Sequence, residues 1–157
     1  MRIAIGNDHG GYPLRAAVVE VIASLGHRAI DFGTAEAEPC DYPDYARQVA
    51  IAVREGEADR GILMCGTGIG MAIAANKVKG IYAALCHDTY SARMARSHNA
   101  ANIITMGGRV IGAGLAKEIL RVFLETEPSP DPRHQRRRAQ VAADLEAALG
   151  TSQETEQ

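Results

Sequence analysis

The stretch Gly61-Ile62-Leu63-Met64-Cys65-Gly66-Thr67-Gly68-Ile69-Gly70-Met71-Ala72-Ile73-Ala74-Ala75-Asn76-Lys77 decides the fold, because it joins three local patterns. Its apolar run 62–64 predicts a buried strand. Alternate glycines at 66, 68 and 70 predict a tight turn with exposed N–H groups, and the Ala-rich segment 69–77 predicts a helix. Together these elements form an anion cradle, since free amides and the positive end of the helix dipole point to one place.

Two side chains at the lip of this turn can take part in chemistry, the thiol of Cys65 and the hydroxyl of Thr67. A helix N-terminus favours the thiolate, which is the reactive form of cysteine. The combination predicts catalysis on an anionic or oxyanion-forming substrate. The alternative is a glycine turn needed only for close packing, with Cys65 as a small buried hydrophobic residue.

Three known anion-binding motifs do not fit this turn. A dinucleotide fingerprint has the pattern G-x-G-x-x-G, and here the third glycine, Gly70, comes one residue early. No Lys-Ser/Thr pair follows the glycines, so the turn is not a Walker loop. A cysteine phosphatase needs an arginine six residues after its cysteine, where Met71 stands.

Strand-like and helix-like segments alternate along the rest of the chain. The predicted strands are 2–7, 27–32, 62–64, 81–86 and 103–106, and the predicted helices are 14–25, 41–54, 69–77, 88–98, 112–124 and 133–149. A linker with three prolines, 125–132, precedes the last helix. Because the strands lack polar alternation, we expect an α/β fold with a five-stranded parallel sheet covered by helices on both faces.

In such a sheet, ligands bind beyond the carboxyl ends of the strands. The polar or glycine-rich residues expected at that edge are Asp8, His9, Cys65, Thr67, Asp88 and 107–109. Arg109 follows two glycines and is placed to reach a bound anion. Asp8 has an alternative role as the N-cap of the first helix, and Asp88 is the predicted cap of the fourth.

Further candidates lie near the C-terminus. His98 and Asn99 end the fourth predicted helix, where the dipole favours an imidazolium, although a structural role is the alternative. Arg133 and Arg137 are four residues apart on the last helix, the spacing that lets two guanidinium groups hold one phosphate. The remaining histidines, His27, His87 and His134, have no evident partner and are interpreted as surface or packing residues.

Size and composition limit the class of protein. The 157 residues predict a single domain, 1–149, with a polar tail at 150–157 that we expect to be disordered. A net charge of −2 and an aromatic content of 4% argue against a nucleic-acid partner. The three cysteines lack metal-ligand spacing, and no signal peptide or membrane-length apolar run is seen. We therefore expect a cytoplasmic protein without a metal site.

Several motifs occur together in a fixed order: Asp8-His9-Gly10-Gly11, the loop 65–70 through Ala74-Ala75-Asn76-Lys77, Ser97-His98-Asn99, Gly108-Arg109-Val110 and Arg133-His134-Gln135. Over about residues 1–145 the chain resembles the type B ribose-5-phosphate isomerases, a family that includes allose-6-phosphate and galactose-6-phosphate isomerases. The resemblance implies a Rossmann-like three-layer fold and a homodimer, in some members paired into a tetramer. It also implies a site at the dimer interface, with the C-terminal helix extending to the partner subunit and no cofactor or metal.

The resemblance assigns roles to residues of this chain. Cys65 would move a proton between C1 and C2, and His98 would open the sugar ring with help from Thr67 and Asp8. A second branch of the family carries a carboxylate base at the position of Met71, which cannot accept a proton here. The amides of 66–70 would stabilise the enediolate. The substrate-binding residues would be Asp8, His9, Gly66, Thr67, Gly68, Ile69, Gly70, Asn99, Arg109, Arg133 and Arg137.

The expected reaction interconverts ribose 5-phosphate and ribulose 5-phosphate. A hexose or tetrose phosphate is a close alternative, since pocket depth cannot be derived from the sequence. A non-catalytic sugar-phosphate or nucleotide sensor is a different class of function. A sensor needs neither a thiol nor an imidazole, so the presence of both favours an enzyme.

Overall fold

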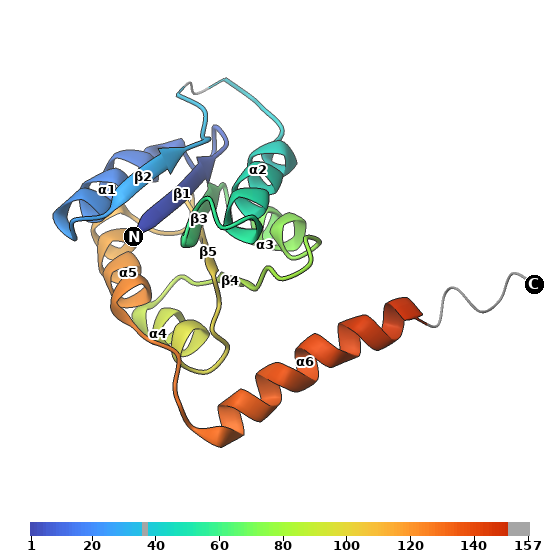
Figure 1. Ribbon diagram of the computed structural model, residues 1–157. Coiled ribbons are helices and arrows are strands. Elements are labelled where there is room, and N and C mark those ends of the chain that lie inside the picture. Colours follow the sequence, from blue (N-terminus) through green and yellow to red (C-terminus); the bar gives the residue numbers. More distant parts are fainter. Residues whose placement is uncertain (36–37, 151–157) are drawn as a thin grey trace, which may run out of the picture.

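The computed structural model describes residues 1–35 and 38–150, and these build one parallel sheet between two layers of helices (Figure 1). The strands are β1 Arg2–Asn7, β2 Arg28–Asp31, β3 Arg60–Cys65, β4 Ala83–Leu85 and β5 Ile103–Gly107. Their order in the five-stranded sheet is β2-β1-β3-β5-β4, and every neighbouring pair is parallel. The predicted α/β fold class is confirmed.

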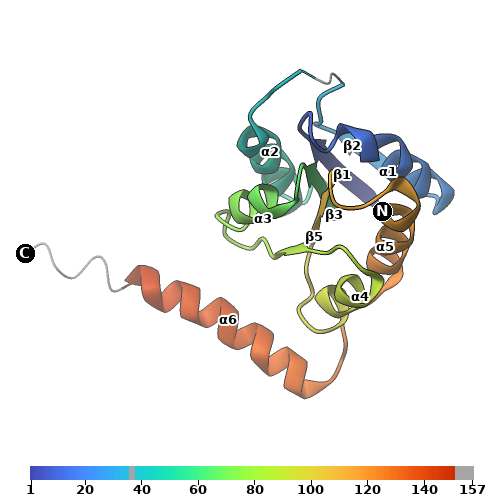
Figure 2. The same cartoon turned by 180° about the vertical axis from the view of Figure 1, so that it is seen from behind.

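The helices are α1 Tyr12–Ser24, α2 Tyr42–Arg54, α3 Ile69–Ala75, α4 Thr89–Ser97, α5 Ala113–Glu125 and α6 Pro132–Gly150. One face of the sheet is covered by α1, α4 and α5, and the other by α2 and α3 (Figure 2). β2, which follows β1 in the chain, lies on one side of β1 in the sheet. β4 and β5, which follow β3, lie on the opposite side of the sheet. The strand order therefore reverses between β1 and β3, which is where open α/β sheets bind ligands.

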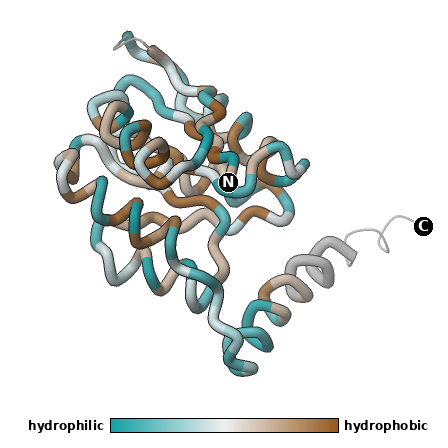
Figure 3. The backbone as a smooth tube through the Cα atoms, turned by 60° about the vertical axis from the view of Figure 1, so that its left-hand side comes forward, coloured by the Kyte–Doolittle hydropathy of each residue, from teal (hydrophilic) through white to brown (hydrophobic). Residues whose placement is uncertain are grey.

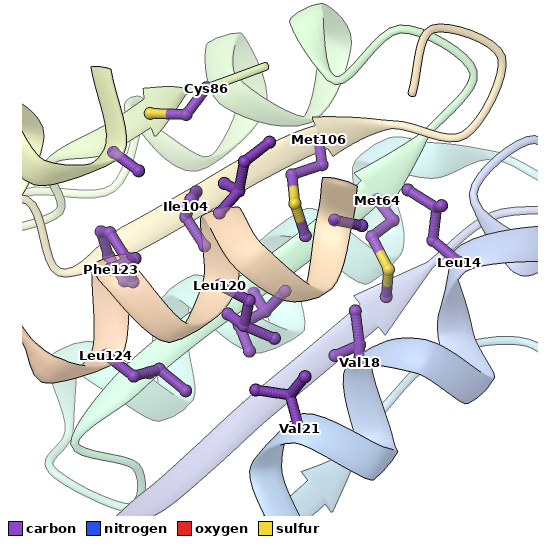
Figure 4. Close-up of a cluster of buried hydrophobic side chains, with 14 of the residues drawn as sticks. Leu14, Val18, Val21, Met64, Cys86, Ile104, Met106, Leu120, Phe123 and Leu124 are labelled. Atoms are coloured by element: carbon purple, nitrogen blue, oxygen red, sulfur yellow. The ribbon is translucent and has the colours of Figure 1, made fainter. Parts of the chain in front are cut away.

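Two apolar layers hold this sandwich together. Alternate residues of β3 point to opposite faces, so Met64 packs toward α1 and α5 while Leu63 packs toward α2. Figure 4 shows Met64 and Met106 of the sheet facing Leu14 and Val18 of α1. Because both faces are covered, the central strands are buried over nearly their whole length and are mostly apolar.

The register of the central strands brings their ends to one edge. Asn7, the last residue of β1, pairs with Met64, and Cys65, the last of β3, pairs with Gly107 of β5. The loops that follow β1, β3 and β5 therefore leave the sheet side by side. This is the edge at which the sequence predicts a ligand site.

Some element ends differ from the prediction, each for a local reason. Helix α1 begins at Tyr12, before Pro13, because a proline in the first helical turn loses no hydrogen bond. Gly26, at φ +69°, ends α1, and the His27 amide donates to the carbonyl of Ile22, so β2 starts one residue later than predicted.

The predicted helix 69–77 and strand 81–86 are both shorter in the structure. The amide side chain of Asn76 bonds to the carbonyl and to the N–H of Ala83, at 2.9 and 2.8 Å. This pair of bonds ends α3 at Ala75 and confines β4 to Ala83–Leu85.

Helix α6 projects away from the sandwich (Figure 1). It follows the linker 126–131, and its first turns are hydrophilic (Figure 3). Gly150 ends the helix, and the rest of the predicted tail, 151–157, lies outside the described residues. Within the described part of the chain, no helix combines the length and apolar character that a membrane crossing requires.

The turn between β1 and α1 packs directly on β3. A Cβ atom on Gly11 would lie 2.3 Å from the carbonyl carbon and oxygen of Met64, closer than any real contact. Because the obstacle is backbone of the central strand, it cannot rotate away as a side chain would. Gly11 is thus required for the turn to close on the sheet.

We predict that Gly11→Ala destabilises the protein by about 3 kcal/mol or more, as overpacking against an immobile backbone does. The matched control is Gly114→Ala in the exposed first turn of α5, where a Cβ meets nothing within 4 Å. That change should be neutral or stabilise by up to about 1 kcal/mol, because alanine favours a helix over glycine. Urea unfolding measures both values, and equal stabilities would contradict the assigned contact.

Candidate active site

The turn after β3 has the geometry of the predicted anion cradle. Gly68 adopts φ +81° at the N-terminus of α3, and a Cβ there would lie 2.9 Å from the backbone of Met106. This left-handed conformation turns the Gly68 amide back toward Cys65, and it donates to Sγ at 3.1 Å. Cys65 is 5% exposed. The hydrogen bond from Gly68 holds its sulfur at the first turn of α3.

The other amides of the turn divide into two groups. The Ile69 amide donates to the hydroxyl oxygen of Thr67 at 3.3 Å. The amides of Gly66, Thr67 and Gly70 donate to no acceptor in the part of the chain that the structure describes. Thr67 and Ile69 are exposed, so the mouth of the turn faces outward. Three free N–H groups next to a sulfur are suited to binding a developing oxyanion.

Asp8 and His9 follow β1 and border the same turn. A Cβ on Gly10 would lie 2.8 Å from the amide nitrogen of Gly66, so the two loops touch. The buried carboxylate of Asp8 accepts from the Gly11 amide at 2.9 Å, and α1 has Gly11 itself at its N-cap. The alternative that Asp8 caps the first helix is therefore wrong; its carboxylate closes the turn before the helix.

His9 is oriented by the loop before α2. Its Nδ1 accepts a hydrogen bond from the Cys40 amide at 3.3 Å, which leaves the proton of the neutral ring on Nε2. The Cys40 thiol also bonds to the hydroxyl of Tyr45 and raises the pKa of that tyrosine, with burial as a further cause. Cys40 thus supports this edge of the site through its neighbours.

Arg109 brings a positive charge to the cradle. Its amide donates to the carbonyl of Gly66 at 3.0 Å, and Gly108 donates to the carbonyl of Cys65 at 2.8 Å. The guanidinium lies over Gly66, with Nη1 3.3 Å from the position that a Cβ would take there. The structure therefore gathers Asp8, Cys65 and Arg109 at one edge, as predicted.

Asp88 lies at the same edge but is engaged. Its carboxylate accepts from the Ser91 amide and hydroxyl, each at 2.7 Å, which confirms the predicted cap of α4. These hydrogen bonds lower the pKa of Asp88. Nearby, burial raises the pKa of Cys86 to about 11, so this thiol remains protonated and inert.

His98, Asn99 and Arg137 meet in a second place, a cavity of about 300 Å³ between α4 and α6. The rings of His98 and His134 stack there, with centroids 4.0 Å apart and planes 12° from parallel. The carbonyl of His98 accepts from Nη1 of Arg138 at 3.3 Å. The described residues that line the cavity are Tyr82, His98, Asn99, His134, Arg137, Arg138 and Val141.

Sequence reasoning missed His134, which was interpreted as a surface or packing residue. It is 7% exposed, and burial lowers its pKa, with a further decrease from the charges of His98 and Arg133. The spacing 134, 137, 138 and 141 follows one face of a helix and would have identified it. Arg133 lies at the edge of this face, with its guanidinium 3.4 Å from Nε2 of His134 and 3.6 Å from the Asp131 carboxylate.

The residues around Cys65 and those around His98 lie at opposite ends of the strands. Cys65 ends β3 at the carboxyl edge, whereas α4 runs back across the sheet, so that His98 lies just before the first residue of β5. A strand of five residues separates these edges by roughly 15 Å at 3.3 Å per residue. A single chain therefore does not bring Cys65 and His98 together, and the cavity is not lined by the cysteine.

The described residues offer no metal centre, because no three or more His, Cys, Asp or Glu side chains among them cluster as metal ligands do. Three free cysteines are present, Cys40, Cys65 and Cys86. Of these, Cys65 alone belongs to the anion cradle. The groups that the site offers for chemistry are thiol, imidazole, amide and guanidinium groups.

Comparison with known proteins gives a consistent result. Residues 3–141 match the family model described as Ribose/Galactose Isomerase. Ribose-5-phosphate isomerase B of Escherichia coli is 46% identical over 142 residues, covering 90% of this chain and 95% of that protein. D-erythrulose-4-phosphate isomerase of Pectobacterium atrosepticum is 47% identical over 128 residues, covering 81% of this chain and 84% of that protein.

The fold agrees as well as the sequence does. The solved structure of Clostridium thermocellum ribose-5-phosphate isomerase B matches with a TM-score of 0.90 and 47% identity, over 94% of this chain and 99% of that one. Family match, identity and fold all cover nearly the same residues. This chain belongs to the ribose/galactose isomerase family of sugar-phosphate isomerases.

Proposed function

We propose that this enzyme interconverts ribose 5-phosphate and ribulose 5-phosphate through an enediolate, with Cys65 as the base. The observation that carries the proposal is the position of the Cys65 sulfur, which accepts the Gly68 amide at the start of α3, in a loop whose next residue, Gly66, lies under the Arg109 guanidinium. An N–H donor and a helix N-terminus both stabilise a thiolate more than a thiol. The turn thereby places the sulfur next to an oxyanion site.

The reaction is a proton shift within one substrate. The Cys65 thiolate removes the proton from C2 of the open-chain aldose, the hydroxyl proton moves from O2 to O1, and the resulting thiol returns a proton to C1 to give the ketose. The electron pair moves onto the carbonyl oxygen, where the free amides of Gly66, Thr67 and Gly70 stabilise the charge. Since no electrons leave the substrate, the scheme requires neither a redox cofactor nor a metal.

The sugar ring must open before this shift can occur. We assign ring opening to His98, assisted by Thr67 and Asp8. His98 lies in the cavity beside Arg137, which would hold the phosphate together with Arg133, while His9, Asn99 and Arg109 bind the hydroxyl groups and the anion. Fixing the phosphate orients C1 and C2 at the sulfur, and such anchoring lowers the barrier as well as improving binding.

Within one chain, Cys65 and His98 lie at opposite ends of the strands. A site that contains both residues therefore needs a second copy of the chain. Exposed apolar side chains border both halves: Ile69 and Ile73 beside the cradle at 51% and 58%, and Val141 at the cavity at 57%. Helix α6 projects from the body and is available to reach a partner (Figure 1). We propose a homodimer with shared sites, alone or paired into a tetramer, and no nucleic-acid or membrane partner.

The free cysteines fit a reducing compartment, and we place the enzyme in the cytoplasm. A tetrose phosphate is the second candidate substrate, because a D-erythrulose-4-phosphate isomerase is as similar to this chain as the pentose enzymes are. The family description also includes galactose, which keeps hexose phosphates as candidates. A non-catalytic sugar-phosphate sensor is disfavoured by the membership in an enzyme family.

The first prediction concerns the substrate. Aldose phosphates of four, five and six carbons, ranked by kcat/KM, should place ribose 5-phosphate first, at about tenfold or more above the others, as one well-fitted group can provide. The measurement is ketose formation by the full-length protein. A higher kcat/KM for a tetrose or hexose phosphate would overturn the pentose assignment, and no turnover on any member would favour the sensor.

The second prediction tests the base. Cys65→Ala should lower the exchange of the C2 proton of ribose 5-phosphate with D2O by about 10²–10⁴-fold, as loss of a general base does. Binding of inorganic phosphate should remain, because the arginines are untouched. Cys86→Ala is the control, since it removes a buried thiol outside the site and should leave exchange within about threefold. Rapid exchange by Cys65→Ala would rule out the cysteine as base.

The third prediction tests the shared site. Cys65→Ala and His98→Asn homodimers should each be inactive, but a heterodimer of the two contains one site with both residues intact. Co-expressed with different tags and purified, it should have about half the wild-type kcat per dimer. The control pairs Cys65→Ala with the Cys65→Ala/His98→Asn double variant, which contains no intact site. A heterodimer as inactive as this control would show that the two residues do not share a site across subunits.

A further inference from the structure

His87 makes a hydrogen bond whose purpose the reaction scheme leaves open. It follows β4 at the carboxyl edge of the sheet and is half-buried. Its Nε2 accepts from the amide of Gly107 at 3.1 Å. From the sequence we expect a surface or packing residue, yet this bond ties the loop after β4 to the last residue of β5.

Gly107 begins the turn that carries Arg109. Three successive amides of this turn each have a fixed acceptor: Gly107 donates to His87, Gly108 to the Cys65 carbonyl at 2.8 Å, and Arg109 to the Gly66 carbonyl at 3.0 Å. The last two acceptors are backbone atoms of the anion cradle. Only the first acceptor is a side chain, so His87 is the anchor that a substitution can remove.

Packing around this turn leaves little room for movement. A Cβ on Gly107 would lie 2.8 Å from the backbone of Thr67, so the two main chains are in direct contact. The next residue is equally close to the loop after β1, since a Cβ on Gly108 would lie 2.4 Å from the carbonyl oxygen of Gly10. A shift of Gly107 must therefore displace Thr67 or the Arg109 turn, and both belong to the proposed site.

We propose that His87 is a positioning residue: its neutral ring, with the proton on Nδ1, holds the turn 107–109 against the Cys65 loop. This turn holds the Arg109 guanidinium over Gly66. Its amides also bind the carbonyl oxygens of Cys65 and Gly66. His87 itself touches no reacting atom. The role requires a hydrogen-bond acceptor at the position of Nε2, which a glutamine side chain can supply and a leucine cannot.

The experiment compares His87→Leu with His87→Gln in the full-length protein. Hydrogen exchange of the Gly107 amide, followed by NMR, should be slow in the wild type and in His87→Gln and about tenfold or more faster in His87→Leu, because exchange follows local opening. For the isomerase reaction, His87→Leu should lose about 10–100-fold in kcat/KM, with kcat lowered and KM raised. A displacement of a catalytic or binding group by about 1 Å lowers the reaction rate by up to about 100-fold.

Rescue by the conservative variant is the decisive readout. His87→Gln should stay within about threefold of the wild type, since it keeps the acceptor. His27→Leu is the matched control, because His27 is also half-buried but lies before β2 at the opposite edge, and it should leave both readouts unchanged. If His87→Leu fails to fold, His87→Ala takes its place.

Two results would overturn the proposal. One is a His87→Leu protein with wild-type kcat/KM and a protected Gly107 amide. The other is an equal loss in His87→Gln and His87→Leu, which would exclude the acceptor role. The kinetic arm rests on the proposed isomerase function, whereas the exchange arm does not. An enzyme inactive on every sugar phosphate would therefore refute the proposed function and leave the test of His87 intact.

Discussion

The site depends on one hydrogen bond, from the Gly68 amide to the Cys65 sulfur. It forms only because residue 68 takes a left-handed conformation at the first turn of α3, which is open to glycine at little cost. The same conformation packs the turn on the Met106 backbone and against the Leu85 side chain. A single backbone angle thus sets the orientation of the thiol, the direction of the neighbouring amides and the contact with β5.

Further hydrogen bonds hold the same turn in place. The hydroxyl of Thr105 on β5 donates to the carbonyl of Gly68 at 2.9 Å. Amides from the following turn bond to the carbonyls of Cys65 and Gly66. The cradle is therefore held by side-chain and main-chain bonds from the adjacent strand, and its geometry exists before substrate arrives. Preorganised donors of this kind need no rearrangement when charge develops on an oxygen.

How much the sequence could predict follows the range of the interactions. The strand, turn and helix around Cys65 are set by neighbours in the chain, and alternating glycines and apolar runs predict them well. The edge that gathers Asp8, Cys65 and Arg109 follows from the parallel sheet alone. The stack of His98 on His134 and the bond between His87 and Gly107 join residues 36 and 20 positions apart. The bond of His87 depends on side-chain directions, which no local pattern specifies. For His134 the helical spacing 134, 137, 138 and 141 does indicate a shared face, but its stacking partner His98 lies on another element.

The second half of the site depends on a buried charge that donates to backbone carbonyls. Arg96 is 2% exposed, and burial lowers its pKa to about 10, which keeps it cationic at neutral pH. Its guanidinium donates to the carbonyl oxygens of Ala101 and Thr126, at 2.7 and 3.2 Å, and lies 5.7 Å from the ring centre of Phe123.

The hydrogen bonds to two carbonyl oxygens explain why the buried cation is tolerated. The partners of Arg96 belong to three separate segments of the chain. Ala101 follows His98 and Asn99, Thr126 starts the linker to α6, and Phe123 is a buried residue of α5. By joining them, Arg96 fixes where α4 ends relative to where α6 begins. The stacked pair of His98 and His134 spans that same junction. The buried Arg96 therefore maintains the alignment of the two helices that form the cavity. The Gly68 amide has the same role in the cradle at the other end of the strands.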